Sequence, residues 1–67
     1  MYPNLEAEMA RKGLKKGEVA DKIGMAYQTF LDKSLGRTDF KVGEAKKIKR
    51  KLFPDHSIEY LFKKKGE

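Results

Sequence analysis

Apolar residues along this chain recur at spacings of three and four, which is the period of helices that bury one face. The pattern predicts five short helices and no strand, over residues 5–12, 17–23, 26–35, 42–52 and 58–62. The side-chain oxygens of Asn4 and Ser57 are typical N-caps for the first and last of these helices. Pro54 ends the fourth helix, because the residue before a proline disfavours helical backbone. The apolar stripe of that helix consists of Val42, Ala45, Ile48 and Leu52.

The stretch over residues 17–35, GEVADKIGMAYQTFLDKSL, predicts two helices that meet at a sharp corner. Ala20 is small enough for the second helix to cross close to it. Gly24 stands where the chain must turn, and glycine adopts a positive φ at little cost. The inside of the corner is predicted to hold Val19, Ile23, Met25 and Phe30. One face of the second helix is then left to solvent, where a DNA groove can receive it.

Length and composition bound the possible functions. Residues 1–62 are predicted to form a single domain, followed by a basic, flexible tail over residues 63–67. With no cysteine and one histidine, His56, which we expect at the surface, we predict no metal site and no cofactor. No apolar run approaches the length of a membrane span, which predicts a cytoplasmic protein. No catalytic constellation or phosphate-binding loop is present in the sequence, so we expect neither an enzyme nor a small-molecule substrate.

The charge balance favours a polyanionic partner. Lysine and arginine number 16 against 10 aspartates and glutamates, a formal charge of +6. Six of these cations lie between residues 41 and 51, with only Glu44 against them: Lys41, Lys46, Lys47, Lys49, Arg50 and Lys51. Net charge also serves solubility, and a lysine run is commonly a solvated face.

Residues 4–62 resemble the phage lambda repressor and Cro-like helix-turn-helix domains, also called the XRE family. The resemblance rests on GEVADKIGMAYQTF, on Asp39-Phe40 and on the run EAKKIKRKLFP over residues 44–54. It implies a compact, all-α, five-helix lambda-repressor-like fold that contains a helix-turn-helix. It also implies a transcriptional regulator of phage or mobile-element type, most simply a repressor, which binds specific sequences of double-stranded DNA. A homodimer on an operator of two half-sites is expected.

The resemblance also implies roles for individual residues. The positions that match base-reading residues are Tyr27, Gln28, Leu31 and Asp32. Gln28 has the chemistry to bond adenine, Leu31 to touch a thymine methyl, and Asp32 to accept from cytosine. The positions that match phosphate contacts are Lys16, Ala26, Arg37 and Lys41, with Ala26 as the first residue of the recognition helix. The candidate dimer contact consists of Ile58, Tyr60, Leu61 and Phe62.

Three departures from the family pattern keep a second function open. Ala26 replaces a serine or threonine, Lys33 and Ser34 stand where an aliphatic residue is usual, and Asp32 adds a negative charge. If α-helical packing and not DNA binding explains these positions, the Gln28 side chain is only solvated. Tyr27 then packs beside Phe30 or a partner subunit, and Asp32 pairs with Lys33 or Lys22. The alternative is a protein-interaction module, antitoxin-like or anti-repressor-like, with weak or no DNA binding. The affinity for DNA falls steeply as the salt concentration rises, whereas the affinity for a partner protein held by leucine side chains changes little.

Overall fold

Helices make up most of the computed structural model, which describes residues 2–65. They are α1 (Pro3–Arg11), α2 (Lys16–Lys22), α3 (Tyr27–Ser34), α4 (Val42–Leu52) and α5 (Ile58–Leu61). Together they form a compact globule with extents of 27, 26 and 21 Å, and residues 2–65 contain no strand. The predicted all-α, five-helix architecture is confirmed. Residues 66 and 67 of the predicted tail, and Met1, lie outside the described residues.

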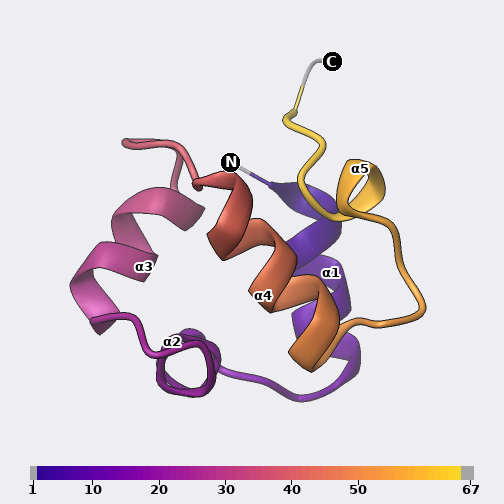
Figure 1. Cartoon of the computed structure of the whole chain (residues 1–67), viewed down its shortest axis with the longest axis horizontal. Helices are drawn as coiled ribbons and strands as arrows, with labels where there is room; N and C mark the ends of the chain where they lie inside the picture. Colours follow the sequence, from indigo (N-terminus) through magenta and orange to yellow (C-terminus); the bar gives the residue numbers. More distant parts are fainter. Residues whose placement is uncertain (1, 66–67) are drawn as a thin grey trace.

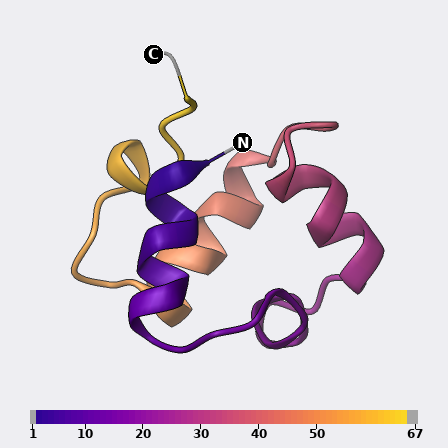
Figure 2. The same ribbon diagram turned by 180° about the vertical axis from the view of Figure 1, so that it is seen from behind.

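Helix α4 lies near the centre of the molecule and contacts both α2 and α5 (Figure 1). Seen from the front, α4 passes across α1, with α2 and α3 to one side and α5 to the other (Figure 1). The reverse view shows α1 in front of α4 (Figure 2). The contacting helix pairs are α2 with α3, α1 with α5, α4 with α5, and α2 with α4. The N-terminal helix is therefore held by the last helix, and the α2–α3 unit is held by α4.

Every helix contributes to one hydrophobic core. Its buried members are Tyr2, Leu5, Met9, Val19, Ala20, Ile23, Phe30, Ile48, Leu52, Phe53 and Leu61. Half-buried Phe40 and Phe62 extend it toward Tyr2, with ring centroids 5.4 Å apart for Tyr2 and Phe40 and 5.2 Å apart for Phe40 and Phe62. Phe30, at the centre of α3, packs edge-on to Phe40 at 5.8 Å. Tilted and edge-on rings are the favourable aromatic geometry, so this cluster fixes the inner face of α3.

The α2–α3 corner has the geometry that its sequence predicts. Gly24 adopts φ +70°, and the N–H of Met25 donates to the Ala20 carbonyl at 2.8 Å. Ala20 retains 1% of its exposed surface, as the close crossing of α3 requires, and Val19 and Phe30 retain none. Met25 is half-buried against the core rather than inside it. We call residues 16–34, with this turn, the bihelical corner.

The helix ends test the capping predictions. Helix α4 has the predicted bounds, and the Ser57 hydroxyl accepts from the Tyr60 N–H at 3.1 Å as predicted. The Asn4 prediction is wrong: α1 begins at Pro3, and the Asn4 amide instead donates to the Tyr60 carbonyl at 2.9 Å. Its side chain has a tertiary partner on α5, which outcompetes the local cap.

Two further positions differ from the predictions. Ala26 is the N-cap of α3 and not its first residue, because its backbone is extended (φ −61°, ψ 142°). Val42 is 71% exposed and does not belong to the apolar stripe of α4. A step of three residues turns a helix by about 300°, so Val42 lies about 60° away from Ala45 around the axis. Ile48, which has no exposed surface, lies about 120° from Val42, so Val42 stands at the outer edge of the predicted stripe.

Candidate nucleic-acid interface

The outer face of α3 carries the four residues predicted to read bases. Tyr27 is 53% exposed and Gln28 is exposed, whereas Leu31 and Asp32 are half-buried. Gln28 and Asp32 lie about 160° from Phe30 around the helix axis, and Tyr27 and Leu31 lie between them and Phe30, which has no exposed surface. The structure therefore brings them together on one surface, at the edge of the molecule opposite α5 (Figure 1).

Asp32 is not an isolated negative charge on this surface. Its Oδ1 accepts from the guanidinium of Arg37 at 3.0 Å and from the Gln28 side-chain amide at 3.2 Å. The predicted local partners, Lys33 and Lys22, are wrong, because Lys33 points inward and the turn after α3 returns Arg37 to Asp32. We call Gln28, Asp32 and Arg37 the Asp32 network. Asp32 thus links Arg37, which is predicted to contact phosphate, to Gln28, which is predicted to read a base.

Tyr27 leans toward the start of α2. A Cβ added at Gly17 would lie 3.8 Å from Tyr27 Cδ1, so the missing side chain of Gly17 leaves room beside the ring. An open hollow of about 710 Å³ lies between Tyr27, the end of α1 and the start of α2; among its lining residues are Met9, Leu14 and Lys16. The tyrosine packs against α2 and not beside Phe30, and its exposed half faces outward.

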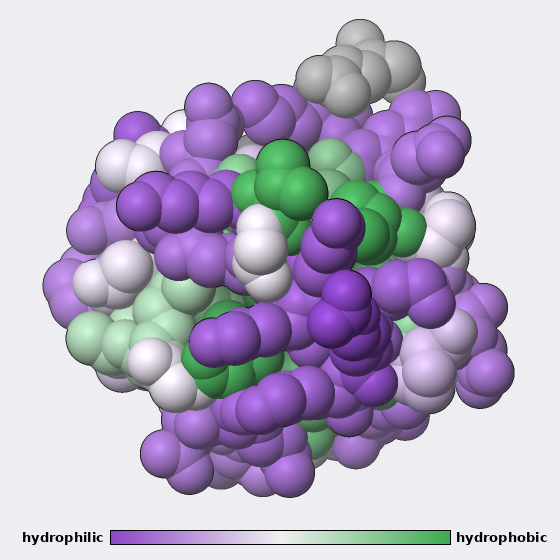
Figure 3. Space-filling view, viewed as in Figure 1, coloured by the Kyte–Doolittle hydropathy of each residue, from purple (hydrophilic) through white to green (hydrophobic). Residues whose placement is uncertain are grey.

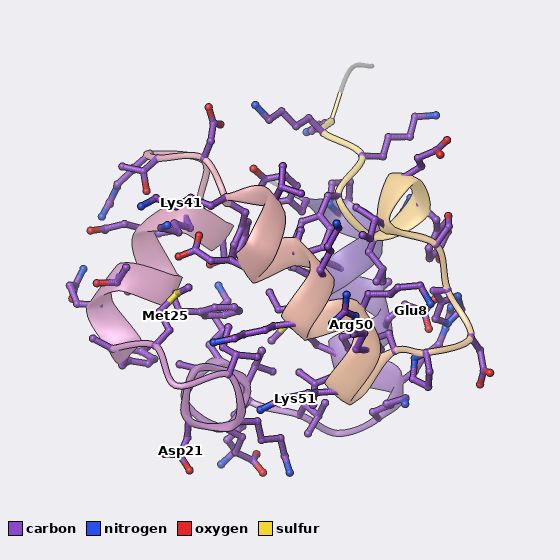
Figure 4. All side chains as sticks on the ribbon, in the orientation of Figure 1. Glu8, Asp21, Met25, Lys41, Arg50 and Lys51 are labelled. Carbon is purple, nitrogen blue, oxygen red and sulfur yellow. The ribbon has the colours of Figure 1, made fainter. Side chains whose placement is uncertain are left out.

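Lys16 and Lys41, two of the predicted phosphate contacts, flank α3 differently. The ammonium of Lys16 lies 3.3 Å from a Glu6 carboxylate oxygen, and its side chain is 28% exposed. Lys41 precedes α4 and lies close to the C-terminal end of α3 (Figure 4). Its side chain makes no ion pair with any residue between 2 and 65. Lys41 is therefore the more available cation of the two.

Glu44 joins α3 to the start of α4. Its Oε1 accepts from the Lys33 ammonium at 2.5 Å and from the Lys41 backbone N–H at 2.8 Å. Burial raises the pKa of Glu44, but these hydrogen bonds and the charges of Lys33 and Lys41 outweigh it and hold that pKa below its usual 4.5. Lys33 retains only 8% exposure, and its charge is neutralised inside the protein. A lysine stem and an ion pair thus fill the position where an aliphatic residue was expected.

The outward face of α4 is basic, and its cations form no ion pair with any residue that the structure describes. Arg50 and Lys51 lie on the side toward the viewer in Figure 4, and that side is mainly hydrophilic in Figure 3. Lys46, Lys47 and Arg50 form no ion pair within residues 2–65, whereas the Lys51 ammonium lies 3.4 Å from the Lys22 carbonyl. These α4 cations add positive potential beside α3, although they are not part of the outer face of α3.

A polar cluster that the sequence patterns did not predict lies on the other side of the molecule, around Glu8. Glu8 is 4% exposed, accepts from the Tyr60 hydroxyl at 2.8 Å, and lies 3.1 Å from His56 Nε2. Arg11 also donates to it. The Tyr60 hydrogen bond is the main reason that the pKa of Glu8 lies below 4.5, and Arg11 and His56 act in the same direction against the effect of burial.

A signal for this cluster was present in the sequence. Glu8 lies on the same helical stripe as Leu5 and Lys12, so its position predicts burial against α5. His56 is half-buried and stacks on Tyr60 with ring centroids 5.2 Å apart. His56 thus lies at the surface as expected, with its side chain 34% exposed, but its contacts with Glu8 and Tyr60 were not predicted.

The predicted dimer contact is only partly accessible. Leu61 has no exposed surface, which removes it from that set, because α5 turns it into the core. Tyr60 is 36% exposed with its hydroxyl bound to Glu8. Ile58 and Phe62 are half-buried and line a hollow of about 290 Å³ together with exposed Val42. Green areas beside the start of α4 and near α5 mark hydrophobic residues on this face (Figure 3).

No family model, no curated protein and no solved structure matches this chain. Within residues 2–65, no helix has the length and apolar character needed to span a membrane. Over the same residues, no three His, Cys, Asp or Glu side chains gather as a metal site would require. The basic tail is described as far as Lys65, and Lys64 lies 3.0 Å from Asp39.

Proposed function

We propose that this protein binds specific sequences of double-stranded DNA and regulates transcription, with α3 of the bihelical corner in the major groove. The observation that carries the proposal is the two-sided character of α3. Its inner side is fixed by Phe30, with no exposed surface, while Tyr27, Gln28 and Thr29 in its first turn are exposed. A rigid helix with a free N-terminal half is what readout of base edges requires.

Cations on both sides of α3 support this proposal. Lys16 lies at the start of α2, and Arg37 and Lys41 follow the C-terminal end of α3. Phosphate contacts from these positions would fix the register of α3, while the bases are read by its side chains. Three such contacts predict that a fourfold rise in monovalent salt weakens binding by one domain about 40-fold.

A twofold dimer is part of the proposal. One domain of this size buries too little surface to hold a short site tightly, and two half-sites about one helical turn apart provide the second contact. Val42, Ile58 and Phe62 supply the exposed apolar surface for such a contact, on a part of the molecule that leaves α3 free. By this proposal the protein acts as a repressor-type regulator of a phage or mobile element.

The test is selection from random duplex DNA at low salt, followed by titration against the enriched duplex. We expect a short motif from the wild type, and a motif that relaxes at one position for Gln28→Ala. Thr38→Ala is the matched control, because Thr38 is exposed in the loop after α3. Absence of any enriched motif from the wild type would reject the proposal.

The same exposed apolar surface favours a second candidate, a protein-interaction module. Val42 is the most exposed of the large hydrophobic residues described, and it lies beside a hollow. In that case the protein binds a partner protein and not DNA, and its affinity for that partner changes little with salt. Binding to DNA with a steep salt dependence would exclude this candidate as the main function.

A further inference from the structure

The Asp32 network is built on the backbone at the end of α3. Gly36 adopts φ +85°, its N–H donates to the Lys33 carbonyl at 3.1 Å, and the Arg37 N–H donates to the Asp32 carbonyl at 2.9 Å. This pair of bonds is a Schellman motif, which reverses the chain at a helix C-terminus. The reversal brings the Arg37 guanidinium to within 3.0 Å of the Asp32 carboxylate. The location of Arg37 therefore depends on the helix end and not on a flexible loop.

The chemistry of Asp32 decides how the Gln28 amide is oriented. An ionised carboxylate only accepts hydrogen bonds, so Gln28 must present its NH2 group, and not its oxygen, to Asp32. The Nε2–Oδ1 distance of 3.2 Å agrees with this assignment. One N–H of Gln28 is used in this contact. The second N–H and the carbonyl oxygen of Gln28, an exposed residue, have no hydrogen-bond partner among residues 2–65.

Those two free groups form a donor–acceptor pair. Adenine presents an acceptor, N7, beside a donor, the N6 amino group, in the major groove, and it is the base that such an amide matches. Arg37 meanwhile neutralises the carboxylate that would otherwise repel phosphate. We propose that Asp32, held by Arg37, is a positioning residue that orients Gln28 to select adenine. This inference rests on the proposed function, and it gives Asp32 a role other than that of a cytosine reader.

The experiment compares base preferences of four proteins on variants of the enriched duplex: the wild type, Gln28→Ala, Asp32→Ala and Asp39→Ala. Asp39→Ala is the matched control, because it removes the same charge from an exposed aspartate that binds Lys64 and not Gln28. The wild type is expected to prefer adenine at one position by about 5- to 150-fold. Asp32→Ala should lose that preference at the same position as Gln28→Ala, whereas Asp39→Ala should keep it.

A purely electrostatic role for Asp32 gives a different result. Removal of the charge would then raise the affinity for every duplex alike and leave the adenine preference unchanged, which would overturn the inference. Relaxation at a position other than that of Gln28→Ala would also overturn it. If the wild type enriches no motif, the proposed function fails, and the base-selecting role of Asp32 fails with it.

Two measurements separate these failures. The side-chain NH2 signals of Gln28 in the free protein report the hydrogen bond without DNA, and they should shift in Asp32→Ala but not in Asp39→Ala. When Arg37→Ala is the only substitution, it should weaken the preference for adenine. In the Asp32→Ala background it should change only the overall affinity, because Arg37 then has no carboxylate through which to act. Unchanged NH2 signals in Asp32→Ala would refute the positioning role even if DNA binding is sequence-specific.

Discussion

Substitution of Gly24 by alanine tests whether the bihelical corner depends on backbone conformation. A Cβ at Gly24 would meet no atom within 4 Å, so crowding contributes nothing to the effect. The cost comes from φ, which is +70° and disfavours any residue with a Cβ by about 1–2 kcal/mol. For a domain of this size, each kcal/mol lowers Tm by about 4–8 °C, so Gly24→Ala should lower Tm by about 4–16 °C.

Gly43→Ala is the matched control for that substitution. Gly43 lies in the first turn of α4, and a Cβ there also meets no atom within 4 Å. Alanine is the better helix former, so this variant should gain up to about 1 kcal/mol. Thermal unfolding followed by circular dichroism measures both variants. An unchanged or raised Tm for Gly24→Ala would refute the reasoning. A lowered Tm for Gly43→Ala would show that available space and backbone conformation do not explain how these substitutions change stability.

Three further predictions concern the packing around the site. Folding lowers the pKa of Glu8, so the stability that Glu8 contributes is present above its unfolded pKa and is lost as the pH falls through its folded pKa. Urea unfolding below about pH 4.5 should therefore show that the stability of Glu8→Gln depends less on pH than that of the wild type. Glu44→Ala should cost about 1–2 kcal/mol in the same assay and more than Lys33→Met, because Glu44 accepts from two donors; equal losses would contradict this. Lys41→Ala should reduce the salt slope of DNA binding by about 0.9 for each bound domain, whereas Lys63→Ala, in the tail, should leave it unchanged.

Local signals predicted the helices well where the deciding interaction is local. The bounds of α4, the Ser57 cap and the Gly24 turn depend on residues within a few positions, and all three are confirmed. The same rules failed for Asn4, because its amide has a partner 56 positions away in the chain. Helix propensity has no information on such a contact.

Polar residues inside the fold were the harder part to predict. Lys33 is charged and nevertheless buried, because Glu44 lies 11 positions further along and neutralises it. The burial of Glu8 could have been inferred from the stripe on α1, but its partners His56 and Tyr60 are set by the loop before α5 and by α5 itself. The periodicity gives the face of a residue, whereas its partner requires the tertiary arrangement.

For the candidate site, helical spacing placed Tyr27, Gln28 and Asp32 on a common outer face. It did not predict that Arg37 returns to Asp32, because that contact needs the positive φ of Gly36 and the Schellman turn. Likewise, the burial of Leu61 follows from the direction in which α5 docks, which no local pattern fixes. Residue types at the site are thus visible in the sequence, and their mutual contacts are not.

The most direct test of the central claim follows the backbone amide signals of the protein in NMR spectra while the selected duplex is added. DNA binding through the bihelical corner predicts that the largest shifts occur over residues 26–32 and at Arg37 and Lys41, with small shifts over residues 53–57. Shifts concentrated on the outer face of α4 over residues 46–51, with α3 unaffected, or no shifts at all, would contradict it.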